Sequence, residues 1–195
     1  YIKIKLFYYY VQYMLLLWFY YWWWYNINIY DFDKTIYDGD SSIDFFLYSL
    51  KRNKRILLNL IPIIINFFLY KLKIKGKKEF KDYFFKFVKK INVNEYVNDF
   101  WEKNDYKIKK FYIKKHKFTD IIISASPEFL LLPVAKKYKF KLIATKYDLN
   151  NYKILGENCY GNEKVRRLKE FGIVKYQEFY SDSKSDEPCA RIAKR

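Results

Sequence analysis

The segment NINIYDFDKT, residues 26–35, combines a short apolar run with two acids one residue apart. Its apolar members are Ile27, Ile29 and Phe32, which are typical of a short buried strand, so we expect a strand over residues 26–32. Asp31 and Asp33 stand where that strand ends. An acid pair in this position is by itself most often part of a turn or a helix cap. A chemical role therefore requires other polar groups to meet it.

The second half of the chain alternates between expected strands and expected helices. We expect strands at 120–125, 141–147 and 176–181, and helices at 128–138 and 164–171. Such alternation predicts a parallel sheet with right-handed crossovers and helices on both faces. The predicted fold class is α/β, with a Rossmann-like three-layer core. Sheets of this kind place their functional sites at the carboxyl ends of the strands.

Polar clusters occur where that rule places a site. They are DFDKT at 31–35, SAS at 124–126, GNEK at 161–164 and SDSKSD at 181–186. Each cluster alone is explained by a helix cap, a polar turn or a solvated helix face. Because they follow one another at successive strand ends, we expect them to converge on one site.

Residues 42–117, between the first two expected strands, show apolar positions at helical spacing and predict a helical insertion. Within it, residues 56–70 (ILLNLIPIIINFFLY) carry no charge and lie between basic residues at 51–55 and 71–78. This run is short for a membrane span. A buried helix is our first expectation, and an interfacial or re-entrant segment held by its basic flanks is the alternative.

These boundaries predict an α/β core of residues 26–41 and 118–195, a helical insertion of residues 42–117, and an aromatic N-terminal extension of residues 1–25. The uncharged part of the extension, from Leu6 to Tyr25, is long enough to span a bilayer as a helix. Aromatic residues throughout it and the lack of an initiator Met favour a translated upstream segment over a membrane anchor. It shows no cleavage site of a signal peptide.

The chain of 195 residues has 38 Lys and Arg against 21 Asp and Glu, a net charge of +17 that suits nucleic acid, anionic lipid or phosphorylated substrates. The bias toward Lys, Ile, Asn, Tyr and Phe is that of an AT-rich coding sequence, and RNA-binding signatures are missing, so nucleic acid is not expected. Two Cys and one His rule out a disulfide framework, a zinc finger and a Cys/His protease. We expect reduced thiols in a cytoplasmic protein, where Cys159 could be accessible.

With DFDKT, IIISAS, GNEKVRRL and SDSKSD in this order, the chain resembles the haloacid dehalogenase superfamily of phosphoryl-transfer enzymes from about residue 26 to residue 195. The insertion looks like the cap of the phosphoserine phosphatase-like branch. Its basic–apolar–basic stretch is similar to that of phosphatidylglycerophosphatase C-like members. Relatives continue through another strand after the fourth motif, so the resemblance implies a truncated C-terminal end.

The resemblance implies a Mg²⁺-dependent phosphomonoester hydrolase that works through an aspartyl-phosphate. It makes Asp31 the nucleophile and Asp33 the general acid and base. Phosphate binding is implied for Ser124, Lys164 and Thr35, the last by orienting the first loop. The implied Mg²⁺ ligands are Asp31, the Asp33 carbonyl and Asp182, with Asp186 holding the metal's water shell.

Three classes of function stay open at this point. A phosphatase for a phospholipid-pathway phosphate, associated with an anionic membrane surface, is our first expectation because the basic flanks of residues 56–70 favour such a surface. A soluble phosphatase for a small metabolite such as phosphoserine is the second. Asp40, in the place of a Glu that phosphoserine phosphatases use, weakens phosphoserine itself. A non-enzymatic basic RNA- or membrane-binding module is the third.

Overall fold

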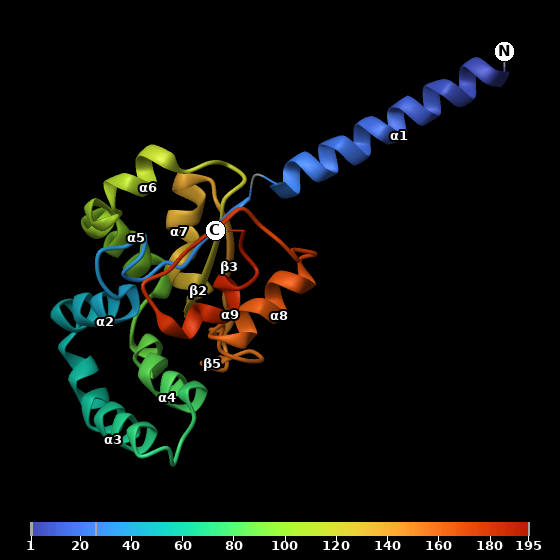
Figure 1. Ribbon diagram of the computed structural model, residues 1–195. Helices are drawn as coiled ribbons and strands as arrows, with labels where there is room; N and C mark the ends of the chain where they lie inside the picture. The colour runs from blue at the N-terminus through green and yellow to red at the C-terminus, as the bar shows by residue number, and fades with distance from the viewer. Residues whose placement is uncertain (1, 26, 195) are drawn as a thin grey trace.

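The computed structural model describes residues 2–25 and 27–194, so residues 1, 26 and 195 of the expected segments lie outside it. A parallel sheet with the strand order β3-β2-β1-β6 forms the centre. Its strands are β1 (Asn28–Tyr30), β2 (Ile121–Pro127), β3 (Lys141–Thr145) and β6 (Glu178–Tyr180). Figure 1 shows α5 and α7 to one side of the sheet and α8 and α9 to the other. The predicted α/β class is confirmed.

The sheet separates two apolar cores. Ile29 pairs with Ile121 on one side and with Phe179 on the other, which places β1 inside the sheet. Ile29 and Ile121 belong to one buried cluster, whereas Tyr30 and Ile122 belong to the other. This alternation explains why both faces of β1 and β2 are apolar, as in parallel sheets that are covered by helices on each side.

The first, third and last strands of the sheet are shorter than the sequence predicts, whereas β2 extends to Pro127. Strand β1 has three residues of the expected first strand and β6 has three of the expected last strand, while Tyr176 forms an isolated bridge with Ala193. The run 141–147 divides, because β3 ends at Thr145 and β4 (Tyr147–Asp148) pairs antiparallel with β5 (Lys153–Ile154). Strand β6 lies at the edge of the four-stranded sheet.

The segment between β1 and β2 is helical, and we call it the insertion. Its elements are α2 (Ser41–Arg52), η1 (Lys54–Asn59), α3 (Leu60–Lys71), α4 (Lys77–Phe84), η2 (Phe85–Lys90), α5 (Val93–Asn104), η3 (Asp105–Lys107) and α6 (Lys110–Lys115). Side-chain caps begin α2 and α5, where Asp40 accepts from Ile43 N at 3.0 Å and Asn92 accepts from Glu95 N at 3.4 Å. A fully buried aromatic centre containing Phe45, Phe87 and Phe100 holds these helices together.

The expectation of a buried helix at residues 56–70 is wrong for most of the segment. Large apolar side chains on and beside α3 are exposed, with relative exposures of 69% for Ile61, 51% for Ile64, 53% for Ile65, 60% for Phe68 and 68% for Leu72. The buried members of α3 are Ile63 and the polar Asn66. The uncharged run predicted helix but did not show which face would meet the core.

Helices α7 (Glu128–Tyr138), α8 (Asn162–Glu170) and α9 (Glu187–Ala190), with η4 (Lys184–Asp186), follow the strands of the second half. Cys159 and Cys189 are free thiols that are fully buried. The expectation that Cys159 could be accessible is therefore wrong, and burial raises the pKa of its thiol to about 11.

The N-terminal segment forms one helix, α1 (Ile2–Tyr25), which extends away from the rest of the chain in Figure 1. None of the described helices combines the length and the apolar character needed to cross a membrane.

Candidate active site

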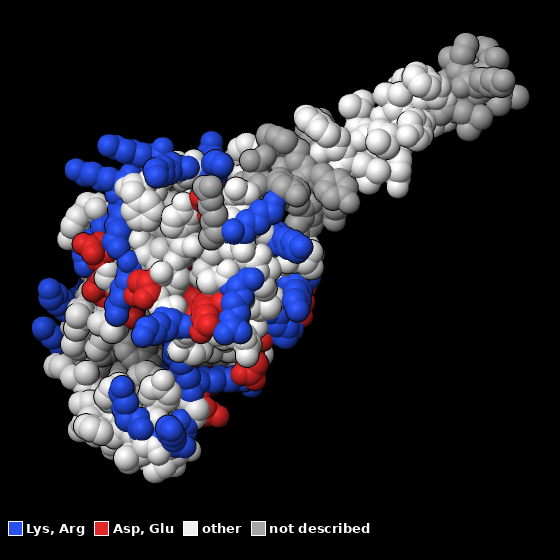
Figure 2. Space-filling model, viewed as in Figure 1, with Lys and Arg blue, Asp and Glu red and all other residues white. Residues whose placement is uncertain are grey.

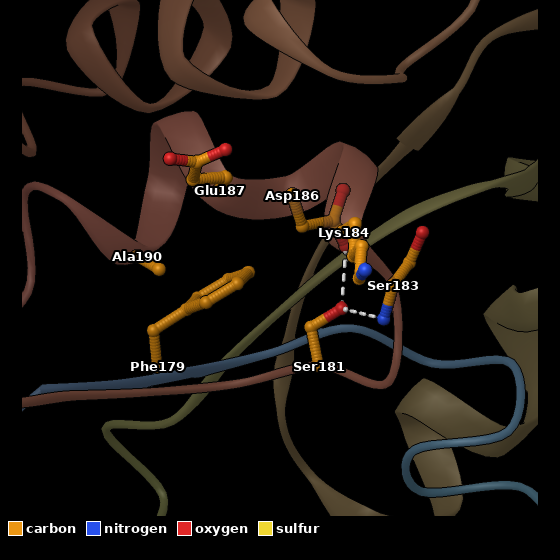
Figure 3. A pocket seen from close by; sticks show the side chains of 7 residues that line it. All are labelled: Phe179, Ser181, Ser183, Lys184, Asp186, Glu187 and Ala190. Carbon is orange, nitrogen blue, oxygen red and sulfur yellow. Dashed lines mark hydrogen bonds between the residues drawn. The ribbon is translucent and has the colours of Figure 1, made fainter.

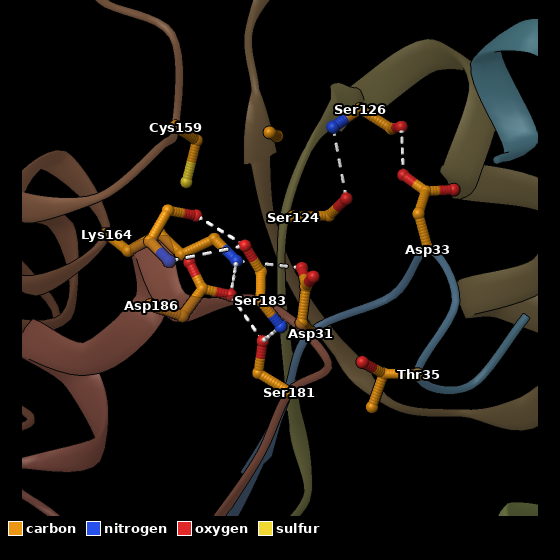
Figure 4. Close-up of polar contacts among 12 residues, drawn as sticks. Asp31, Asp33, Thr35, Ser124, Ser126, Cys159, Lys164, Ser181, Ser183 and Asp186 are labelled. Carbon is orange, nitrogen blue, oxygen red and sulfur yellow. Dashed lines mark hydrogen bonds and ion pairs between the residues drawn. The ribbon is translucent and has the colours of Figure 1, made fainter.

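Lys164 joins the first and last polar clusters. Its Nζ lies 2.8 Å from Asp31 Oδ1 and 2.7 Å from Asp186 Oδ2 (Figure 4). Side-chain exposure is 2% for Lys164, 12% for Asp31 and 2% for Asp186. Ser181 Oγ donates to the same Asp186 oxygen at 2.8 Å. Residues that lie more than 130 positions apart in the sequence thus form one buried ionic cluster, which we call the Lys164 cluster.

The backbone positions of Asp31 and Lys164 explain why their side chains meet. Asp31 directly follows β1, and its N–H donates to the Tyr180 carbonyl of β6 at 2.8 Å. Lys164 stands in the first turn of α8, which begins after Gly161 with φ +57°. That φ lies in the left-handed region, which favours glycine at this entry into the helix. The charged side chains of Asp31, Lys164 and Asp186 therefore meet at the carboxyl ends of the strands, as the sequence led us to expect.

Asp33 has a different environment. Ser126 Oγ donates to Asp33 Oδ2 at 2.5 Å, and the Ser41 N–H donates to Asp33 Oδ1 at 2.7 Å. Ser126 N in turn donates to Ser124 Oγ at 3.0 Å, and Ser42 Oγ lies 2.9 Å from Ser126 Oγ. In Figure 4, Asp33 and Ser126 lie apart from the Lys164 cluster, beyond Asp31 and Ser124. The two aspartates of the first motif thus have distinct partners, one cationic and one made of neutral donors.

Thr35, Asp182 and Asp186 differ in how directly they contact the site. Thr35 Oγ1 accepts from the Asp182 N–H at 3.1 Å, which ties the first loop to the last. The Asp182 side chain is exposed, so its recorded contact with the site is through the backbone. Asp186 lines a pocket of about 450 Å³ between β6 and α9, together with Phe179 and Ser181 (Figure 3). The structure therefore brings Asp186, but not the Asp182 carboxylate, into direct contact with Lys164.

Electrostatics separate the two aspartates further. Burial raises the pKa of Asp31, and Lys164 opposes this rise. Burial alone would lower the pKa of Lys164, but the carboxylates of Asp31 and Asp186 together raise it. Burial, followed by the charge of Asp40, raises the pKa of Asp33 to about 6. A carboxyl group with such a pKa can both give and take a proton near neutral pH.

The charges of the Lys164 cluster suit a divalent cation. One ammonium faces two carboxylates, and Asp186 Oδ1 is buried with no hydrogen-bond partner among residues 2–25 and 27–194. No three His, Cys, Asp or Glu side chains of those residues come close enough to hold a metal by themselves. Mg²⁺ typically takes one or two carboxylates and keeps several waters. The donor set therefore fits this ion.

A sequence model for haloacid dehalogenase-like hydrolases matches residues 29–191. The chain belongs to the haloacid dehalogenase-like hydrolase family. It is accordingly an enzyme of the hydrolase class, and Mg²⁺ is the metal that this family generally uses. A search of curated protein sequences found no match.

Solved structures share the fold of this hydrolase at low sequence identity. A protein of unknown function from Bordetella pertussis Tohama I has a TM-score of 0.61 at 14% identity, over 75% of this chain and 74% of that one. A phosphoserine phosphohydrolase-like protein from Francisella tularensis subsp. tularensis SCHU S4 has a TM-score of 0.51 at 14% identity, over 86% and 82%. A phosphoserine phosphatase in apo form has a TM-score of 0.51 at 13% identity, over 87% and 83%.

Sequence reasoning missed several polar groups of this hydrolase site. Ser41 and Ser42 of α2 reach Ser126, but serines at a helix start are explained by capping alone. Lys77 and Lys81 of α4 also come near the motifs. Their four-residue spacing was the available signal, and it is hidden among 38 basic residues.

Proposed function

We propose that this hydrolase is a Mg²⁺-dependent phosphatase that cleaves phosphomonoesters through an aspartyl-phosphate. The observation that carries the proposal is the Lys164 cluster, in which Asp31 is buried, paired with Lys164 and close to Asp186. Phosphate-ester hydrolysis needs a nucleophile, a positive charge beside the phosphoryl group and a proton donor for the leaving oxygen. The site holds a candidate for each.

Asp31 is the nucleophile in this proposal. Lys164 Nζ donates to Asp31 Oδ1 at 2.8 Å. This contact orients the carboxylate through one of its oxygens and leaves the other oxygen for attack on phosphorus. Attack by the carboxylate forms the new O–P bond while the ester O–P bond breaks, and water then cleaves the aspartyl-phosphate at phosphorus. Lys164 offsets the negative charge that accumulates between the carboxylate and the phosphoryl oxygens.

Asp33 is the proton donor and acceptor. Hydrogen bonds from Ser126 Oγ and the Ser41 N–H fix its two oxygens, so the carboxyl group has one preferred orientation. It gives its proton to the leaving alcohol oxygen in the first step and removes a proton from water in the second. The raised pKa of Asp33, about 6, supports this dual role.

Phosphate and metal contacts complete the proposal. Ser124 Oγ accepts from Ser126 N, which leaves its hydroxyl proton free to meet a phosphate oxygen. Thr35 acts by positioning, since its oxygen holds the last loop. Mg²⁺ would be held by Asp31, the Asp33 carbonyl and Asp182, with Asp186 on its water shell. Bound there, the ion neutralises phosphoryl charge.

Hydrolysis of p-nitrophenyl phosphate by the full chain tests this function. We expect turnover that requires Mg²⁺ and falls at least about 10³-fold in Asp31→Asn, because the amide is not a nucleophile. Asp38→Asn removes an exposed acid of the same loop and serves as the matched control, with activity unchanged. Equal rates in the two variants, or no turnover with Mg²⁺, would contradict the proposal and favour a non-enzymatic module.

We further propose an anionic membrane surface as the partner and a phospholipid-pathway phosphate as the substrate. The exposed face of α3 supports this, because its outward side chains are apolar apart from Lys71 at its end, and they include Ile61, Ile64 and Phe68. Lysines and arginines lie at both ends of α3, and the surface there is largely uncharged with blue groups beside it (Figure 2). An apolar helix face between basic residues fits the interface of an anionic bilayer.

A position-specific fluorescence measurement tests the membrane proposal. A polarity-sensitive fluorophore on Ile64→Cys is expected to shift to the blue when vesicles containing phosphatidylglycerol are added. The same label on Leu132→Cys, which is exposed on α7, is the control and should not shift. The native cysteines are fully buried, so labelling is selective. Equal behaviour at both positions would overturn membrane docking through α3, and it would favour the soluble-metabolite alternative.

A further inference from the structure

Two lysines of α4 lie against the active site. Lys77 and Lys81 are four residues apart and thus share one face of the helix. Lys81 Nζ donates to the Ala125 carbonyl at 2.6 Å and to Asn158 Oδ1 at 3.2 Å. Ala125 stands between Ser124 and Ser126, so Lys81 contacts the end of β2, where Ser126 binds Asp33. The insertion therefore places a cation directly beside the proposed phosphate-binding strand end.

Neither ammonium has a carboxylate partner among residues 2–25 and 27–194. No acid of the described chain lies within ion-pair distance of Lys77 or Lys81. Lys77 Nζ lies 3.1 Å from the centroid of the Tyr160 ring. Burial, followed by the charge of Lys164, lowers the pKa of Lys77 to about 8, and burial, followed by Lys77, lowers that of Lys81 to about 8. Crowded cations of this kind are stabilised when an anion joins them.

Asn158 supplies a third donor. Its side-chain Oδ1 accepts from Lys81 and, at 3.1 Å, from Thr145 Oγ1, whereas its Nδ2 is buried without a hydrogen-bond partner among the described residues. Asn158 is 8% exposed and lines a pocket of about 440 Å³ together with Lys77 and Tyr160. The other lining residues are Gly76, Lys78, Glu79, Glu157 and Glu163. A buried amide donor without a partner, beside two lysines that have no carboxylate partner among the described residues, is the pattern expected of an anion subsite.

We propose that Lys77, Lys81 and Asn158 form a second anion subsite, which binds a further negatively charged group of the same phosphomonoester substrate. This inference rests on the proposed phosphatase function. Lys164, Ser124 and the expected Mg²⁺ already serve the phosphoryl group that is transferred. The substrate class is therefore a phosphomonoester that also carries a carboxylate or a phosphodiester a few bonds away.

Binding to an inactive enzyme separates this inference from catalysis. In an Asp31→Asn background, isothermal titration with 2-phosphoglycolate and with ethyl phosphate compares two ligands of similar size, of which the first carries the added carboxylate. We expect 2-phosphoglycolate to bind at least about tenfold more tightly. This preference should fall to less than about twofold when Lys77→Met is added. A preference that Lys77→Met leaves intact, or no preference at all, overturns the subsite even where the parent chain is an active phosphatase.

A second variant and a matched control guard against structural artefacts. Lys81→Met should also remove the preference, but it breaks the bond to the Ala125 carbonyl and can disturb the end of β2, where Ser126 binds Asp33. Lys77 makes no such backbone bond within the described part of the chain, so agreement between the two variants supports the subsite. Lys51→Met removes an exposed charge from α2 and should retain the full preference. Loss of the preference in Lys51→Met would show a general effect of charge and overturn the assignment.

The two sources of the second anion are separated by turnover in detergent micelles. A glycerophospholipid with both a terminal phosphomonoester and a phosphodiester is compared with phosphatidic acid, which has the phosphomonoester alone. A fall in kcat/KM of at least about tenfold for the first lipid only, in Lys77→Met, supports a lipid source. The same selective fall for 2-phosphoglycolate over ethyl phosphate supports a soluble metabolite. Equal falls within both pairs would place Lys77 at the transferred phosphoryl group and overturn the proposal.

Discussion

The Lys164 cluster and helix α3 reverse the usual positions of charged and apolar side chains. In the cluster, Lys164 and Asp186 are each 2% exposed, whereas Ile61 and Phe68 of α3 are 69% and 60% exposed. Charges persist inside because each has an ionic partner. The apolar face has no such partner among the described residues. Both exceptions to ordinary burial mark proposed functional surfaces, one for chemistry and one for docking.

The largest expected effect comes from removing the central cation. Lys164→Met leaves Asp31 and Asp186 buried and facing each other without a counter-charge. We expect the free energy of unfolding to fall by roughly 3–5 kcal/mol. Urea denaturation measures this change, and Lys169→Met, an exposed lysine on the same helix, is the control with an expected change within about 0.5 kcal/mol. Equal stability of the two variants would show that the cluster does not depend on its ion pairs.

A smaller effect distinguishes the two sides of α3. Ile63 and Ile64 are neighbours in the sequence, but they are 8% and 51% exposed. Ile63→Ala should lower the free energy of unfolding by roughly 2–4 kcal/mol, because it leaves a cavity, whereas Ile64→Ala should change it by less than about 0.5 kcal/mol. Urea denaturation of both variants without lipid measures the contrast. A comparable loss in Ile64→Ala would mean that the outer face is covered in solution, which would undermine the membrane proposal.

The contrast also shows what the sequence could predict. Asp31, Lys164 and Asp186 go with the first, third and fourth expected strands, and parallel strands bring their carboxyl ends to one edge. Their convergence therefore follows from the order of the motifs and the fold class. The roles assigned to them stay predictions that the variants above test.

The orientation of the insertion was beyond sequence reasoning. Residues 56–70 are apolar on every side, so periodicity could not show that Ile63 turns inward and Ile64 outward. The position of Lys81 was equally hidden, because its bond to the Ala125 carbonyl depends on how α4 packs across the chain. Tertiary packing, rather than local pattern, decides such contacts.

The smallest expected effect concerns Asp120, a buried acid that forms no ion pair among the described residues. Asp120 is fully buried at the start of β2, where its Oδ2 accepts from Lys117 N at 2.8 Å and its Oδ1 has no partner among the described residues. Burial raises the pKa of Asp120 to about 6. The folded chain therefore keeps a proton that the unfolded chain releases above about pH 4. Stability from this proton is present at low pH and is lost as the pH rises through about 6.

Asp120→Asn cannot ionise, so its stability relative to the parent chain should increase between pH 4 and pH 7. We expect a gain of roughly 1–3 kcal/mol across this interval, measured by urea denaturation at both pH values. Asp38→Asn, at an exposed acid, should show no such pH dependence. If the difference between Asp120→Asn and the parent chain is the same at both pH values, burial does not penalise this carboxylate. Such a result would also remove the contrast with Asp31, where Lys164 opposes the rise in pKa that burial causes.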